Sequence, residues 1–149
     1  MAQETSSLWK ALLRTKGTKK EYQFDINGTV YGPEREVEHS VDAGLYEEFG
    51  IGNAATAKLT LKLYADSVPR AATIKRYVRL KNSSQATEWL PKGVFFTNRR
   101  SEEDGQWTVE AFDAMRKAER VWTPDQSLTF PMTAPNAVAE IARIMQVQV

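Results

Sequence analysis

The chain contains a single imidazole, His39, the residue type most suited to proton transfer near neutral pH. It lies in R-E-V-E-H-S-V, where it alternates in step with Val37 and Val41, so its ring is expected to face inward. A nucleophile–base pair would need Ser or Thr beside the ring and a carboxylate behind it. A packed histidine that hydrogen-bonds a backbone group is the better interpretation. Without an H-x-x-x-H or H-x-H companion, a histidine-rich metal site is excluded.

Carboxylates crowd two places, the run Glu102, Glu103, Asp104 and the pair Glu47-Glu48. A glycosidase needs two acids roughly 5–10 Å apart across a cleft, one of them in an apolar pocket that raises its pKa. A hairpin tip provides neither. The sequence also has no cysteine, and G-x-G at residues 50–52 lacks the third glycine of a dinucleotide loop. We therefore predict no catalytic, cofactor-binding or metal site, and no enzyme activity in this segment.

Aromatic side chains are the remaining candidates for ligand binding. They could stack on sugars or nucleobases if they formed one exposed row. Their alternation divides them between two faces, so most are interpreted as core. A carbohydrate- or cell-wall-binding β module stays open as the alternative function. The aromatic residues concerned are Trp89, Trp107, Trp122, Phe95, Phe96 and Phe112.

The charge balance offers no general attraction to polyanions, because 20 basic and 19 acidic side chains give a net charge of +1. Local basic clusters at residues 14–20 and 70–81 are interpreted as solvated faces in preference to phosphate-binding sites. We expect no sequence-specific nucleic acid as a partner. No run of ~18 apolar residues occurs, so no membrane insertion is expected.

Strand signals fill the middle of the chain. Asn27-Gly28 between alternating runs predicts a hairpin, since both turn positions require positive φ. Residues 56–64 alternate so that the leucines and Ala57 face one side, which predicts a half-buried strand, and residues 74–80 form a weaker one. A second hairpin turns at residues 103–105. Asp113 is then placed to cap a helix over residues 114–121.

Helical patterns occur near both ends. Ser6 or Ser7 can cap the first helix, and Asn136 can cap a last helix that runs to Met145. Each helix has an apolar stripe that needs a partner, and these stripes are the candidate interface. The residues concerned are Leu8, Trp9, Leu12, Leu13, Val138, Ile141, Ile144 and Met145.

The fold class that follows is mainly β (α+β). It consists of an antiparallel β-barrel or strongly bent sheet with short peripheral helices at both ends. We expect an N-terminal helical arm over residues 1–20 and a β-barrel domain with its closing helix over residues 21–122. Residues 123–149 are expected to form a proline-containing connector and a helix that starts a second domain.

Several motifs resemble the N-terminal domain of phage tail-hub proteins, the baseplate hub or tail-associated lysin of phages and prophages of Gram-positive bacteria. The resemblance covers roughly residues 5–145. It depends on S-V-D-A-G-L-Y-E-E-F-G-I-G-N-A at 40–54, V-P-R-A-A-T-I at 68–74, W-L-P-K-G-V-F at 89–95 and F-D-A-M at 112–115.

This resemblance implies a structural subunit that assembles as a ring, usually a trimer, with other tail proteins such as the distal tail protein. Such hubs join the tail tube to the tip and line the DNA channel. It also implies a location in the virion tail, and in the host cytoplasm during assembly. Relatives often have a peptidoglycan hydrolase much later in the chain.

Overall fold

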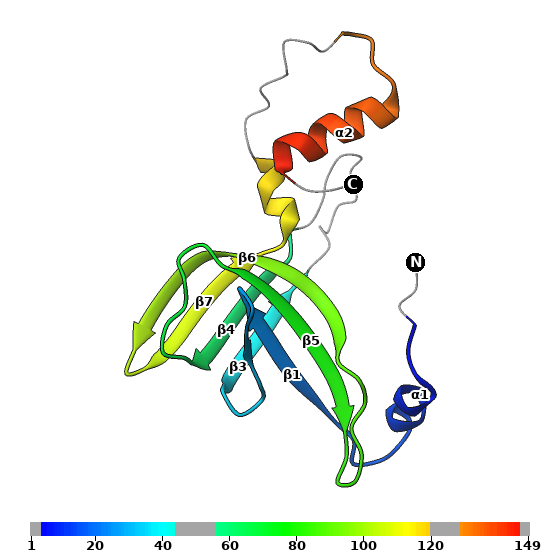
Figure 1. Cartoon of the computed structure of the whole chain (residues 1–149), viewed down its shortest axis with the longest axis vertical. Helices are drawn as coiled ribbons and strands as arrows, with labels where there is room; N and C mark the ends of the chain where they lie inside the picture. Colours follow the sequence, from blue (N-terminus) through cyan, green and yellow to red (C-terminus); the bar gives the residue numbers. More distant parts are fainter. Residues whose placement is uncertain (1–3, 44–55, 120–128, 147–149) are drawn as a thin grey trace.

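A computed structural model describes residues 4–43, 56–119 and 129–146 of the 149-residue chain. Strands make up most of the regular secondary structure of the described chain, with a short helix near each end (Figure 1). In chain order the elements are α1 (Ser7–Leu13), β1 (Lys19–Ile26), β2 (Thr29–Tyr31), β3 (Glu36–Asp42), β4 (Lys58–Tyr64), β5 (Thr73–Lys81), β6 (Leu90–Glu103), β7 (Gln106–Phe112), η1 (Ala114–Glu119) and α2 (Ala134–Met145).

The strands form one antiparallel sheet in the order β2-β1-β5-β6-β7-β4-β3. No backbone pairing joins β2 to β3 in the described part of the chain, so the sheet is open, and of the two expected forms it is the strongly bent one. Register shifts bend it, between Lys75 and Tyr77 on the β5–β6 pair and between Thr97 and Arg99 on the β6–β7 pair. Figure 1 shows β5 and β6 curving along their length.

The concave side of the bent sheet encloses the main core. Leu59, Leu61 and Leu63 of β4 are fully buried, which confirms the alternation seen in the sequence. Side chains from β1, β5, β6 and β7 and from the loop between β4 and β5 complete it. The other members are Phe24, Ile26, Ala65, Val68, Ala72, Ile74, Phe95, Val109 and Ala111.

Both predicted turns are present. Asn27 and Gly28 have φ values of 51° and 91°, and the Gly28 N–H donates to Asp25 Oδ1 at 2.6 Å. Asp104 and Gly105 have φ values of 51° and 76° in the second hairpin. These are the positive-φ positions that Asn, Asp and Gly tolerate best.

The helix boundaries differ from the predictions. Asp113 does act as a cap, since its Oδ1 accepts from the Met115 N–H at 3.0 Å, but η1 is a six-residue 3₁₀ helix that ends at Glu119. The predicted capping role of Asn136 is wrong, because α2 begins two residues earlier with Thr133 as its N-cap residue. Pro135 fits in the first turn, where its missing N–H is not needed.

We predict that Leu61→Ala lowers the free energy of unfolding by about 2–5 kcal/mol, because it leaves a cavity in a fully buried site. Urea denaturation would measure the change. Lys62→Ala is the matched control: its partly exposed ammonium pairs with Glu38, so the loss should be about 1 kcal/mol or less. Equal effects of the two substitutions would contradict the assignment of the inner face.

Candidate functional site

The apolar stripe of α1 is largely used inside the molecule. Trp9 and Leu12 are buried in a second cluster with Val78, Leu80 and Leu90 at the end of β5 and the start of β6. Leu8 packs against this cluster, whereas Leu13 is 60% exposed. Most of the apolar stripe of α1 therefore packs against β5 and β6, and only Leu13 of its four residues is exposed to solvent.

Ser6 fixes the start of α1. Its hydroxyl accepts from the Trp9 N–H at 3.1 Å, which confirms the predicted cap. The same hydroxyl donates to Glu88 Oε2 at 2.8 Å, and the Ser6 N–H donates to Glu88 Oε1 at 3.0 Å. The backbone hydrogen bond from Ser6 is the main reason that the pKa of the Glu88 carboxyl lies below its usual value. The helix is thus tied to the segment that leads into β6.

The apolar stripe of α2 is buried at its C-terminal end and exposed in the middle of the helix. Met145 is buried and Ile144 is half-buried, while Val138 and Ile141 are 52% and 54% exposed. We call Val138 and Ile141 the α2 patch. Beside it, Ile141 and Phe130 line an apolar hollow. Figure 1 shows α2 next to η1 and far from α1, so the structure does not bring the two predicted stripes together.

His39 lies in a polar cluster on the inner side of the sheet. Its Nδ1 is 2.5 Å from Glu36 Oε1, and its Nε2 is 3.1 Å from Arg76 Nη2. Because arginine can only donate, Nε2 accepts from Arg76 and Nδ1–H donates to Glu36. The prediction of a backbone partner is therefore wrong, although the inward orientation is confirmed. We call Glu36, His39 and Arg76 the inner polar cluster.

Aromatic rings of β1 cover this cluster. The His39 ring centroid is 4.2 Å from that of Tyr22 and 5.3 Å from that of Phe24, both in edge-on geometry, and Arg76 lies over the Tyr22 ring. The His39 side chain is only 10% exposed. Its two nitrogens are occupied and its faces are covered, so the imidazole is poorly placed to take a proton from a substrate.

Sequence reasoning missed Arg76 and Glu36. Arg76 belongs to the basic cluster that the sequence analysis assigns to a solvated face. On β5, however, it occupies the inward position between the buried Ile74 and Val78, and the alternation of β5 predicts this position. Val37 was expected to face inward with His39, yet it is 46% exposed. A register shift between Glu36 and Glu38 breaks the alternation there.

The sheet aromatics have cations over their rings. Arg79 lies 4.4 Å from the Trp89 ring centroid, and Lys117 lies 3.8 Å from that of Phe96. The remaining pairs are Arg100 with Trp107 and Arg116 with Phe112. Phe95 is buried in the core, and Trp122 lies outside the described residues. Trp89, Phe96, Trp107 and Phe112 are half-buried and each has a cation over its ring, so they do not present the free, exposed faces that sugar stacking requires.

Of the candidate carboxylates, those at residues 102–104 lie at the β6–β7 turn, and the other two lie outside the described residues. Glu102 Oε1 accepts from the Gly105 N–H at 2.7 Å, and Glu103 and Asp104 are exposed. Glu47, Glu48 and the glycines at 50 and 52 lie outside the described residues. Within the described ranges, no group of three or more His, Cys, Asp or Glu could hold a metal ion. None of the described helices is long and apolar enough to cross a membrane.

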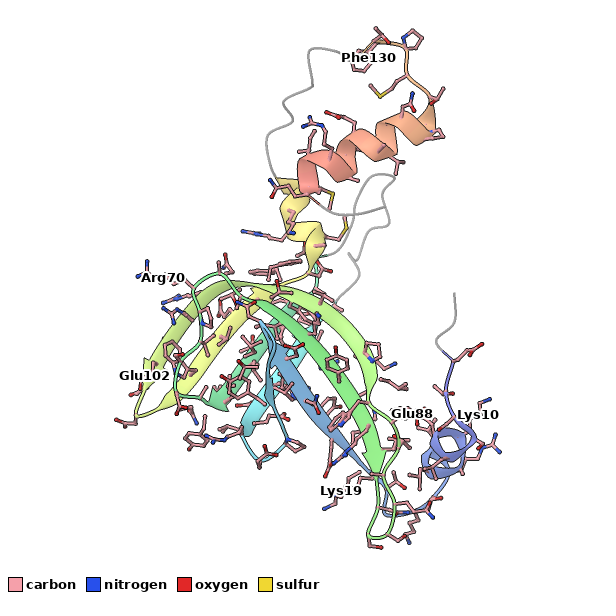
Figure 2. The ribbon with its side chains drawn as sticks, viewed as in Figure 1. Lys10, Lys19, Arg70, Glu88, Glu102 and Phe130 are labelled. Carbon is pink, nitrogen blue, oxygen red and sulfur yellow. The ribbon has the colours of Figure 1, made fainter. Side chains whose placement is uncertain are left out.

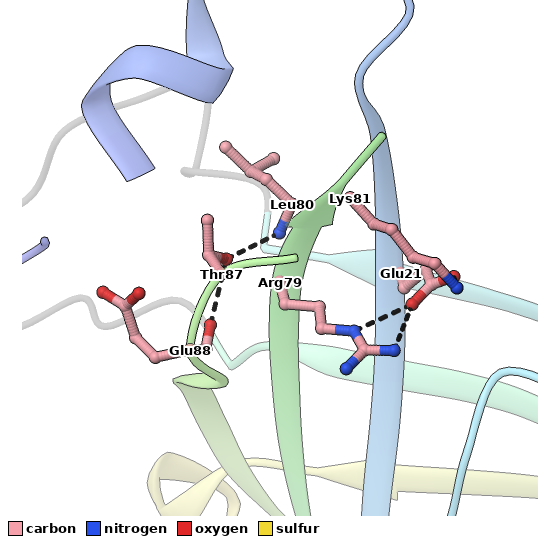
Figure 3. Close-up of polar contacts among 6 residues, drawn as sticks. All are labelled: Glu21, Arg79, Leu80, Lys81, Thr87 and Glu88. Carbon is pink, nitrogen blue, oxygen red and sulfur yellow. Dashed lines mark hydrogen bonds and ion pairs between the residues drawn. The ribbon is translucent and has the colours of Figure 1, made fainter. Parts of the chain in front are cut away.

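Glu21 is the centre of an ion-pair network on β1 and β5 (Figure 3). Its Oε2 accepts from Arg79 Nε at 2.8 Å and Nη2 at 2.6 Å, and Lys81 Nζ lies 3.1 Å from Oε1. Burial raises the pKa of the Glu21 carboxyl, but the hydrogen bonds and charges of Arg79 and Lys81 together outweigh burial and leave the pKa below its ordinary value of 4.5.

The inner polar cluster should stabilise the fold measurably. We predict that His39→Ala lowers the free energy of unfolding by about 1–3 kcal/mol, because Glu36 and Arg76 then keep their burial and lose their hydrogen-bond partner. Glu38→Ala on the same strand is the control, since it removes only an exposed ion pair. A urea unfolding midpoint for His39→Ala that equals the control would show that the cluster contributes nothing.

The Glu21 network should make stability depend on acidity. A carboxyl whose folded pKa is lowered stabilises the fold above its unfolded pKa, and this contribution disappears as pH falls through the folded pKa. We predict that Glu21→Gln is less stable by about 1 kcal/mol at pH 7 and that the difference vanishes as pH falls below 4.5. Unfolding curves at several pH values would measure it, with Glu103→Gln as the control for loss of one charge. A difference that grows with acidity would refute the assignment.

Comparisons of this chain with protein-family models, curated proteins and solved structures find no match.

Proposed function

We propose that the chain is a structural subunit of a phage or prophage tail hub that assembles with copies of itself and with neighbouring tail proteins. In this proposal the domain joins the tail tube to the tip and lines the DNA channel, without catalysis. The four quoted motifs are its basis in the sequence. The structural observation that supports it best is the α2 patch, which leaves two large apolar side chains of a folded helix in solvent.

The places that the motifs occupy suit a scaffold. In W-L-P-K-G-V-F, Leu90 packs against α1 while Phe95 enters the main core. In F-D-A-M, Asp113 accepts from the Ala57 N–H at 3.1 Å as well as from η1. These two motifs hold α1 and η1 in fixed relation to the sheet, which a subunit that forms regular contacts with neighbours requires.

The occupied imidazole also agrees with a role without catalysis. His39 is held between a carboxylate and a guanidinium and is covered by two rings. The alternative of a sugar-binding module is disfavoured by the cations that lie over Trp89, Trp107, Phe96 and Phe112. A sugar would have to displace these cations before it could stack on the rings.

Assembly can be tested by the solution mass of the purified protein. We predict a trimer, three times the 16.8 kDa subunit mass, by light scattering coupled to size exclusion. Ile141→Asp should shift the protein to monomer, because a charge in an apolar interface loses its hydration. Ala139→Asp places the same charge elsewhere on exposed α2 and should leave the mass unchanged.

Circular dichroism would verify that both variants fold. A wild-type protein that stays monomeric at high concentration, alone and with a distal tail protein, would refute the proposal. Equal dissociation by Ile141→Asp and Ala139→Asp would show that the α2 patch is not the interface.

A further inference from the structure

A hollow lined by three arginines lies between β6 and the loop that joins β4 to β5. Its volume is about 440 Å³, within the ~300–1,000 Å³ range of small-molecule sites. Arg70 comes from the loop, and Arg99 and Arg100 come from β6, with Trp107 beside them. Figure 2 shows Arg70 on the loop beside β6 and Glu102 farther along toward the hairpin tip.

The sheet leaves this hollow open. β5 begins at Thr73, which pairs with Phe96, so β6 has no neighbouring strand on that side beyond this point. The loop lies there instead: the Thr97 N–H donates to the Ala72 carbonyl at 3.0 Å, and the fully buried Val68 holds the loop to the core. An exposed strand edge and an anchored loop therefore form the two walls.

Arg100 is held in position in this hollow. Its guanidinium donates to the Val68 carbonyl and lies 4.9 Å from the centroid of the Trp107 ring. Two fixed contacts remove most of the rotamer freedom that a surface arginine has. The positive charge is therefore positioned before any ligand arrives.

The other two arginines have no acidic partner among the described residues. Arg70 and Arg99 are exposed and form no ion pair there. Glu110 lies opposite Arg99 on β7, but it pairs with Lys58 at 3.2 Å. Glu102 is the one acid among the described residues that line the hollow, so the lining carries three positive charges and one negative charge.

We propose that this hollow binds a single phosphate monoester, with Arg70 and Arg99 as its charged ligands and Arg100 as a fixed third donor. Guanidinium groups match phosphate oxygens in pairs, and a dianion neutralises the excess of two positive charges. The hollow is larger than a phosphate ion, which leaves room for the organic part of the ester beside Trp107. Glu102 at the rim disfavours a continuous polyanion. This site is independent of the proposed assembly.

The test is an NMR titration of the full chain at constant ionic strength with inorganic phosphate, with glycerol 3-phosphate, and with glycerol as the uncharged control. We expect saturable shifts of the amides of Arg70, Arg99 and Arg100 and of the Trp107 indole N–H. Arg70→Gln and Arg99→Gln should each weaken binding about tenfold. Arg14→Gln should not change it, because Arg14 is an exposed arginine at the end of α1 and does not line the hollow.

Three outcomes would overturn the proposal. The first is shifts that do not saturate or that spread equally over Arg14, Lys16 and Lys19. The second is unchanged affinity in Arg70→Gln and Arg99→Gln with the spectra of folded protein. The third is tighter binding of a short single-stranded oligonucleotide through the same residues with a steep salt dependence, which would assign the hollow to a polyanion instead.

Discussion

The shape of this protein depends on a sheet that bends far enough for its two sides to meet through side chains. β3 lies at one edge of the strand order and β1 lies next to the other edge, yet His39 of β3 contacts Tyr22 and Phe24 of β1. Backbone hydrogen bonds do not join these strands among the described residues. The hydrogen bond from Arg76 to His39 and the contacts of the surrounding rings therefore join the two ends of the sheet, as backbone hydrogen bonds do in a closed barrel.

A polar contact at this position joins the two ends of the open sheet beside the buried core. His39 joins Glu36 to Arg76 through its two ring nitrogens where the apolar side chains end, and the Tyr22 ring packs against His39. The buried Nε of Arg76 has no hydrogen-bond partner among the described residues. A row of leucines in the same place would fill the space but would fix the relative position of the strands less sharply, because apolar packing has no direction. The register shifts on β6 produce the curvature of the sheet. The inner polar cluster fixes how closely β3 approaches β1 and β5.

Local features of the fold followed from the sequence, because they depend on neighbouring residues alone. Leu59, Leu61 and Leu63 alternate, so the half-buried strand β4 needs no long-range information. Asn27-Gly28 can adopt positive φ, so the same is true of the turn between β1 and β2. The partners of His39 could not be predicted in this way. They are Glu36, brought inward by a bulge, and Arg76, distant in sequence, and both depend on the curvature of the whole sheet.

The candidate interaction surfaces also differ in how far local sequence patterns predict them. Apolar stripes were predicted on both helices, but helical spacing cannot tell a stripe that packs on its own sheet from one that remains exposed. α1 buries Trp9 and Leu12, whereas α2 leaves Val138 and Ile141 in solvent. The arginine-lined hollow depends on the loop between β4 and β5 lying beside β6, and no local pattern predicts that.

The edges of the sheet have a consequence for how the protein behaves at high concentration. β2 is only three residues long, and β3 has a bulge with the ionisable Glu36 and His39 facing inward. Short, bulged and charged edges resist pairing with the strands of another molecule. Pairing of another copy's strands onto the β2 and β3 edges, and growth of fibrous aggregates through these edges, is thereby disfavoured.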